Sequence, residues 1–110
     1  MELGILKSFK MEQLKPLSEF FAAIENDPRI STTHIGIYAA LLQYWKKHNY
    51  NNPVQAYSHD IMQLAKISAR ATYNKVIKDL SEFGYIKYEP SYKRNQGSKV
   101  YMFFPEAVSN

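Results

Sequence analysis

Residues 64–86 of the chain read LAKISARATYNKVIKDLSEFGYI, and this stretch decides the fold. The spacing of its apolar residues predicts the end of one helix, over about 58–66, and the whole of another, over 68–83. A tight turn joins the two helices, and their expected N-caps are Ser58 for the first and Ser68 for the second. Gly84 follows at the position where glycine commonly ends a helix. Two short helices joined by so short a turn are typical of a helix-turn-helix unit.

The chain after this unit predicts a β-hairpin. Tyr85–Glu89 and Lys99–Phe104 have the alternating or aromatic-rich pattern of strands. The segment between them, Pro90–Ser98, reads PSYKRNQGS and is a polar, basic loop. A hairpin appended to a helix-turn-helix unit in this way is a wing.

The chain before the unit predicts a longer helix and a short strand. The helix covers about Thr33–His48, with Ser31 or Thr32 as its N-cap. Asn49–Pro53 breaks it, and Val54–Tyr57 has the pattern of a strand. The apolar positions of the helix, spaced by threes and fours, are His34, Tyr38, Leu41, Leu42 and Trp45.

A fourth, shorter helix is expected near the N-terminus. It covers Glu19–Asn26, with Ser18 as its cap and Asp27-Pro28 as its end. Together these elements predict an α+β fold: a winged helix-turn-helix with a three-helix core and a small antiparallel sheet, preceded by one extra helix. The expected divisions are an N-terminal arm and short helix over 1–30, a winged-helix domain over 31–104, and a C-terminal tail over 105–110.

The distribution of charge favours a polyanionic partner. The chain has 110 residues and a net charge of +4, but residues 66–99 hold eight basic and three acidic residues. That segment therefore carries +5 and the rest of the chain −1. A surface that is merely solvated would spread its charge more evenly. Charge alone leaves both interpretations open.

The helix over 68–83 has two unlike faces. Its apolar arc, which must be buried, consists of Ala69, Thr72, Tyr73, Val76, Ile77, Leu80 and Phe83. Its opposite arc consists of Arg70, Ala71, Asn74, Lys75 and Lys78. Arginine and lysine donate to base-edge acceptors in the major groove, and asparagine pairs with adenine. The helix N-terminus at Ser68 offers free N–H groups to a phosphate. A solvated amphipathic helix would have a charged face too.

The wing carries the second set of candidate contacts. Its loop and second strand supply side chains suited to phosphate oxygens or a minor-groove wall: Tyr92, Lys93, Arg94, Gln96 and Lys99. A polar hairpin loop without a ligand is the alternative. Lys46, Lys47 and His59 are further possible phosphate contacts, although the two lysines also suit the C-terminal end of a helix.

The stretch 64–86 resembles the helix-turn-helix and first wing strand of bacterial winged-helix regulators. Their pattern is matched by Leu64-Ala65, Ser68, Arg70, Thr72, Leu80 and Gly84-Tyr85-Ile86. More narrowly, three segments resemble small winged-helix proteins carried on conjugative transposons and prophages of Bacteroidetes-type bacteria. These segments are STTHIGIYAALLQYW, KISARATYNKVIKDL and GYIKYEPSYKRNQGSKVYM. The resemblance covers about Ser31–Phe104 and implies a transcriptional regulator, with excision or replication roles as alternatives. The turn is shorter than usual and has Ile67 near the place of the common glycine.

An enzyme is not expected. The chain has no cysteine, and His34, His48 and His59 lack metal-ligand spacing. No glycine-rich phosphate loop is present. Tyr73 lies near Arg70 as a recombinase tyrosine would, but it falls on the inward arc. We therefore expect no catalytic residue, no metal, no cofactor and no evident small-molecule effector.

The sequence also predicts a cytoplasmic location. Its longest apolar run, Ile35–Leu42, is far shorter than the roughly 20 residues that span a bilayer. The N-terminal residues carry charges throughout and have no apolar core of a secretion signal. A chain without cysteine is compatible with a reducing compartment.

Two functions from different classes remain open. The first is a sequence-specific regulator that binds double-stranded DNA, expected as a homodimer through residues 1–27, where Phe20–Ile24 is nearly uncharged. The second is a protein-binding winged helix in a replication, excision or segregation complex. There the partner would be bound by exposed aromatic residues such as Tyr92, Tyr101 or Phe103.

Overall fold

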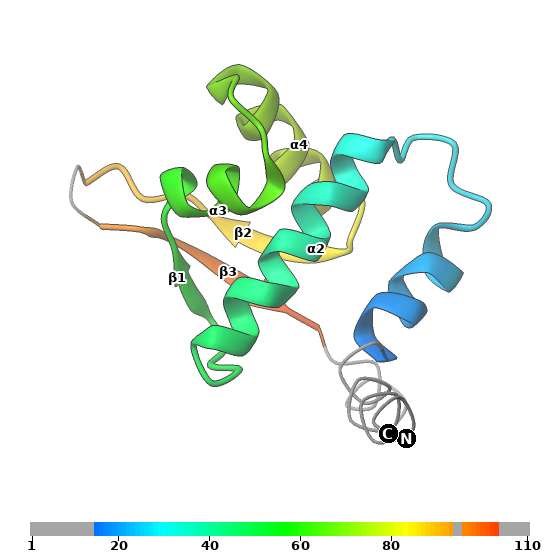
Figure 1. Ribbon diagram of the computed structural model, residues 1–110, viewed down its shortest axis with the longest axis horizontal. Coiled ribbons are helices and arrows are strands. Elements are labelled where there is room, and N and C mark those ends of the chain that lie inside the picture. The colour runs from blue at the N-terminus through cyan, green and yellow to red at the C-terminus, as the bar shows by residue number, and fades with distance from the viewer. Residues whose placement is uncertain (1–14, 94–95, 104–110) are drawn as a thin grey trace, which may run out of the picture.

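The computed structural model describes residues 15–93 and 96–103. Within them the chain forms four helices and a three-stranded antiparallel sheet, which confirms the α+β class (Figure 1). The first helix covers residues 15–24. The elements that follow are α2 (Thr32–Lys47), β1 (Val54–Ala56), α3 (Ser58–Ala65), α4 (Arg70–Glu82), β2 (Ile86–Glu89) and β3 (Ser98–Met102).

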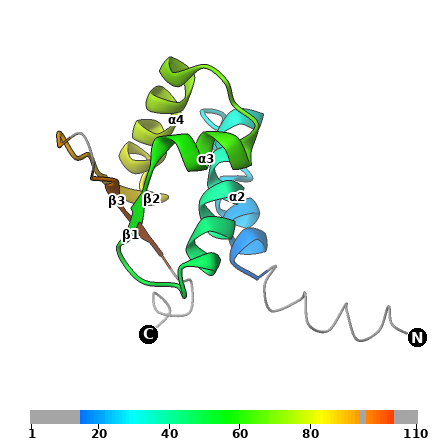
Figure 2. The ribbon, with the colours of Figure 1, turned by 60° about the vertical axis from the view of Figure 1, so that its left-hand side comes forward.

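The sheet joins the hairpin to the short strand that precedes α3. Its strand order is β1-β3-β2, with both pairs antiparallel. Val100 stands opposite Val54 on one side and opposite Tyr88 on the other. Helices α2, α3 and α4 lie together on one side of the sheet (Figure 2).

The core lies between the helices and the sheet. Its largest fully buried side chains come from every layer, including Trp45 and Leu41 from α2, Ile77 from α4 and Ile86 from β2. The helix at 15–24 adds Phe20, whose ring stacks on Tyr38 with centroids 3.8 Å apart. Burying each such side chain contributes about 1.5–3 kcal/mol, so the shared core holds all four helices in place.

Of the two N-caps predicted for α2, Ser31 is the one observed, and the helix begins at Thr32, one residue earlier than predicted. Ser31 is the N-cap, and its backbone N–H donates to His34 Nδ1 at 3.0 Å. Ser31 Oγ lies 2.8 Å from the same nitrogen. Because Nδ1 accepts, the ring proton belongs on Nε2, which faces α4. The side chain of His34 is thus engaged on both sides.

Three other predicted caps are wrong. Ser18 lies inside the helix at 15–24. The N-cap of α3 is Tyr57, so Ser58 is the first helical residue. The N-cap of α4 is Ala69 and makes no side-chain cap bond, so Ser68 lies one residue before it.

The turn between α3 and α4 explains the last of these differences. It covers residues 66–69, and Lys66 adopts the left-handed conformation at φ 62°. Lysine therefore takes the left-handed conformation that favours glycine, one residue before Ile67, which the resemblance placed near the common glycine. This conformation redirects the chain, so the N-cap of α4 lies one residue later than predicted.

Other boundaries differ by one or two residues. Tyr57 and Tyr85 lie just outside β1 and β2, and β3 ends at Met102. Phe104, the predicted end of that strand, and the tail over 105–110 lie outside the described residues. No helix in the described part of the chain has the length and apolar character needed to cross a bilayer.

Candidate nucleic-acid interface

Helix α4 presents one polar face to solvent and buries the other. The apolar residues at spacings of three and four are buried: Tyr73, Val76, Ile77 and Leu80. The five residues of the predicted outer arc are all exposed: Arg70, Ala71, Asn74, Lys75 and Lys78. The helix therefore holds a basic face outward on a rigid apolar base.

Part of the predicted inner arc is wrong. Ala69 and Thr72 are exposed, and Phe83 is only half-buried. Burial of α4 begins at Tyr73, because the first turn of the helix extends past the core. Thr72 therefore joins the exposed N-terminal end of the helix, where the sequence placed only Ser68, Arg70 and Ala71.

The start of α4 is tied to the start of α3. Arg70 Nη1 donates a hydrogen bond of 2.6 Å to Ser58 Oγ. Ser58 is half-buried, whereas Arg70 and Ser68 are exposed. The bond holds the guanidinium between the two helices, so the N-terminal ends of α3 and α4 share one surface.

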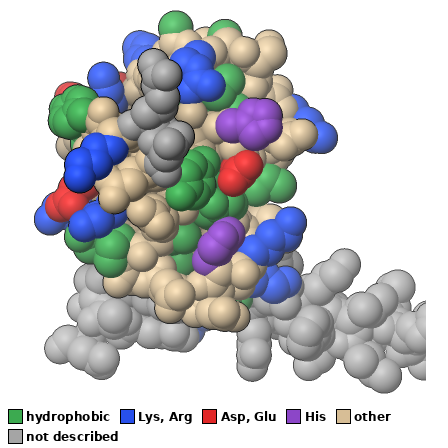
Figure 3. Space-filling model, turned by 90° about the vertical axis from the view of Figure 1, so that its left-hand side faces the viewer, with side chains coloured by type: hydrophobic (Ala, Val, Ile, Leu, Met, Phe, Trp, Pro, Cys, Tyr) green, Lys and Arg blue, Asp and Glu red, His purple; other side chains and the backbone are tan. Residues whose placement is uncertain are grey.

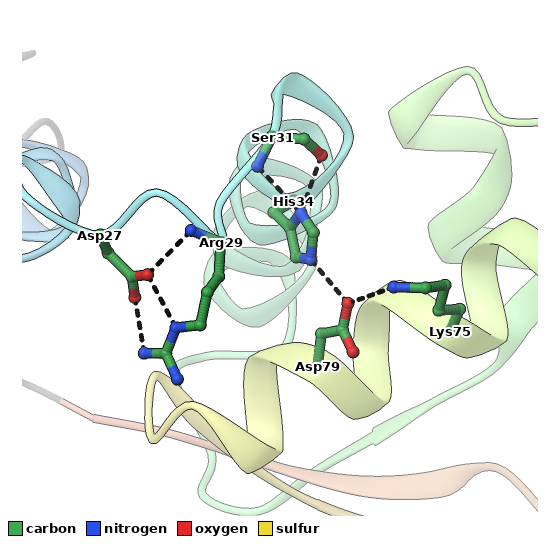
Figure 4. A network of polar contacts seen from close by, with 6 residues as sticks. All are labelled: Asp27, Arg29, Ser31, His34, Lys75 and Asp79. Atoms are coloured by element: carbon green, nitrogen blue, oxygen red, sulfur yellow. Dashed lines mark hydrogen bonds and ion pairs between the residues drawn. The ribbon is translucent and has the colours of Figure 1, made fainter.

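The two acids of α4 have different surroundings. Asp79 Oδ2 lies 2.9 Å from Lys75 Nζ and 2.9 Å from His34 Nε2 (Figure 4). The hydrogen bonds from Lys75 and then from His34 lower the pKa of Asp79. Glu82, the last residue of the helix, is exposed. The N-terminal half of α4 thus faces solvent without an acidic residue of its own.

The hairpin places its loop beside α3 and α4. Tyr92 is 94% exposed, and Lys93, Gln96 and Lys99 are exposed as well. Arg94, a predicted contact, lies outside the described residues. Figure 3 looks onto this side of the molecule, where lysine and arginine side chains lie around the periphery and apolar side chains nearer the middle.

A groove of about 400 Å³ lies where these elements meet. Its walls include predicted contacts from both parts of the interface, namely Asn74, Tyr92, Lys93 and Gln96, together with His59 from α3. Lys99 instead borders a separate hollow of about 260 Å³, with Gln96. The fold thus brings the recognition face and the hairpin loop together, but divides the predicted hairpin residues between two hollows.

Gly97 explains how closely the hairpin approaches β1. A Cβ atom at this position would lie 2.9 Å from the Ala56 carbonyl oxygen. A side chain here would push the hairpin away from β1 and from the start of α3. The absence of a side chain therefore sets the width of the groove.

The sequence missed two parts of this site. Tyr57, which is 42% exposed, lines the groove, and the only signal for it was its place before the helix-starting Ser58. The contact between His34 and Asp79 was also missed, because His34 was assigned only to the core. Of the secondary candidates, Lys46, Lys47 and His59 are exposed.

Tyr73 lies in the interior, as its inward wheel position predicted. Its side chain is 3% exposed, and burial raises the pKa of its phenol well above the usual value. Among the described residues, no group of three or more histidine, aspartate or glutamate side chains is placed to hold a metal ion.

Comparisons of the chain with protein-family models, with curated proteins and with solved structures give no match.

Proposed function

We propose that this protein is a winged helix-turn-helix protein that binds double-stranded DNA through α4 and the β2–β3 hairpin. The observation that carries the proposal is the exposed face of α4, which combines Arg70, Asn74 and Lys78 over a buried apolar back. The major groove is about 12 Å wide and admits a helix. At 13 residues, α4 is about 20 Å long, enough to follow the groove over part of a turn.

The expected contacts divide into two kinds. In the DNA major groove, Arg70 and Asn74 read base edges, because their side chains can make paired hydrogen bonds to guanine and adenine. Ala71 lets the backbone approach closely. Lys78 and the start of α4 bind phosphates, which supply affinity without sequence choice.

The hairpin supplies contacts beside the groove. Lys93 and Gln96 reach phosphates or a minor-groove wall, and the fully exposed ring of Tyr92 packs on a sugar. The groove of about 400 Å³ between the hairpin loop and α4 gives the DNA backbone room to pass between them.

The test is the salt dependence of binding to a random-sequence duplex, followed by fluorescence anisotropy. About six phosphate contacts predict a slope near −5 for log K against log salt. Selection of bound duplexes from a random library would then supply the preferred sequence. Absent binding, or binding with a flat salt response, would contradict the proposal.

The wider role that we infer is regulation of transcription on a mobile element, in the cytoplasm and without catalysis. We also propose a homodimer, with the helix at 15–24 as the contact. Phe20 is buried in the core of its own chain, but Phe21 on the same helix is 46% exposed and is available to a second copy. Light scattering during size exclusion at tens of micromolar tests this part, and a strict monomer would remove it.

A second candidate function is protein binding in a replication or excision complex. It is favoured by the exposure of Tyr92 at 94% and of Phe103 at 44%. Tyr101, the third aromatic residue considered, is less available to a partner because it is half-buried rather than exposed. Lys87 also lies over its ring, with Nζ 5.2 Å from the ring centroid. The salt series separates the two functions, because a protein adaptor would not need to bind duplex.

A further inference from the structure

The two lysines on the outer face of α4 differ in their surroundings. Lys75 Nζ lies 2.9 Å from Asp79 Oδ2, four residues further along the same helix. Lys78 is also exposed, but it makes no ion pair or hydrogen bond with any described residue. The charge of Lys75 is therefore partly neutralised before any ligand arrives, whereas the charge of Lys78 is not.

The carboxylate that holds Lys75 is itself anchored. His34 Nε2 donates to the same Oδ2 atom at 2.9 Å, and the His34 side chain is only 7% exposed. The Ser31 backbone N–H fixes the other ring nitrogen at 3.0 Å. Because α2 holds Asp79 from the inner side, the carboxylate cannot follow Lys75 outward when the lysine reaches toward a ligand (Figure 4).

We propose that Asp79 competes with DNA phosphates for Lys75 and so weakens binding to non-specific duplex; this inference rests on the proposed function. On random DNA, Lys75 must give up Asp79 to gain one phosphate. Asp79 is thus a residue that limits the affinity for non-specific DNA, and His34 is the residue that positions it.

The direct test compares Asp79→Asn with Glu82→Gln. Both remove one negative charge from α4, but only Asp79 holds Lys75. The readout is the affinity for a random duplex at several salt concentrations. An exposed ion pair is weak, so we expect Asp79→Asn to raise affinity about fivefold. The salt slope should also become more negative by about 0.9, the value of one added phosphate contact. Glu82→Gln should raise affinity less than about twofold with an unchanged slope.

A Lys75→Gln background completes the comparison. In that background Asp79→Asn and Glu82→Gln should change the affinity for duplex equally, because Lys75 is no longer there to be released from Asp79. Equal effects in the wild-type background would overturn the inference while leaving the proposed function intact. Absence of duplex binding by the wild type would overturn both.

A second comparison leaves Asp79 in place and so does not depend on the folding of the Asp79 variant. Lys78→Gln should make the salt slope less negative by about 0.9. Lys75→Gln should change the slope by clearly less, because Asp79 already competes with phosphate for the Lys75 ammonium group. An equal or larger change at Lys75 would contradict the inference.

Discussion

His34 Nε2 and Asp79 Oδ2 lie 2.9 Å apart and join the start of α2 to α4 across 45 residues of sequence. His34 is the buried polar residue among those described, at 5% exposure. Its two ring nitrogens are both engaged, by Ser31 and by Asp79. This contact ties α4, which carries the basic face, to the start of α2.

His34→Ala should lower the free energy of unfolding by about 2–3 kcal/mol. The substitution removes the ring acceptor of the Ser31 backbone N–H, a bond worth about 1 kcal/mol, and leaves the half-buried Asp79 carboxylate without its hydrogen bond from α2. Urea denaturation measures the change. His59→Ala is the matched control, because His59 is exposed, and should stay within about 0.5 kcal/mol of wild type. A loss at His34 no larger than that at His59 would show that the contact does not hold α4.

An ion pair between Asp27 and Arg29 fixes the segment before α2 and predicts a pH dependence. Asp27 accepts hydrogen bonds from the Arg29 guanidinium, each 2.8 Å long, and from the Tyr85 hydroxyl. The hydrogen bond from Arg29 first, and that from Tyr85 second, hold the pKa of Asp27 well below its usual value. An aspartate in the unfolded chain titrates near pH 4, at about 3.9.

A depressed pKa means that the unfolded chain binds more protons in this range than the folded one. The contribution of Asp27 to stability is therefore complete above about pH 5 and is lost as the pH falls through 4 toward 2. The urea midpoint, measured from pH 7 to pH 2, should therefore fall at acid pH in the wild type. In Asp27→Asn this fall at acid pH, the acid limb of the curve, should be smaller. Glu25→Gln removes an exposed carboxylate with no ion pair among the described residues, and should leave the limb unchanged. An unaltered limb in Asp27→Asn would contradict the account.

Two glycines give opposite predictions for the same substitution. Gly97→Ala places a Cβ atom 2.9 Å from the Ala56 carbonyl oxygen and should destabilise the protein by about 1–3 kcal/mol. Gly36 lies inside α2, and apart from its chain neighbours and the adjacent helix backbone no atom lies within 4 Å of its added Cβ. Gly36→Ala should therefore stabilise by about 0.5–1 kcal/mol. Thermal unfolding of the two variants measures both signs, and a neutral Gly97→Ala would show that the hairpin need not approach β1 so closely.

The local elements of the fold could be predicted because each has a local cause. The apolar spacing in α4 predicts which of its faces is buried, and Tyr73, Val76 and Leu80 are buried as expected. Gly84 adopts φ 90° directly after the helix, as its position predicted. The cap of α4 was misplaced because it depends on the left-handed turn at Lys66, a conformation that lysine rarely adopts and that its sequence does not announce.

The contacts between distant residues could not be predicted. Sequence spacing does not show that His34 meets Asp79, because nothing local relates two residues on different helices. It also does not show that β3 pairs with both β1 and β2, which brings Gly97 against Ala56. The exposure of the predicted α4 residues followed from helical periodicity, whereas the groove that Asn74 shares with Tyr92 followed only from the packing.

The most direct test of the central proposal is the affinity of the double variant Lys75→Ala, Lys78→Ala for a random duplex. Both lysines are exposed on α4, so thermal stability should be nearly unchanged. The control is Lys46→Ala, Lys47→Ala, which removes the same charge from the last turn of α2, away from α4 (Figure 1). We expect the α4 variant to lose at least about tenfold in affinity and the control about threefold or less. Equal affinities of the α4 variant and the wild type would show that this face of α4 does not bind DNA.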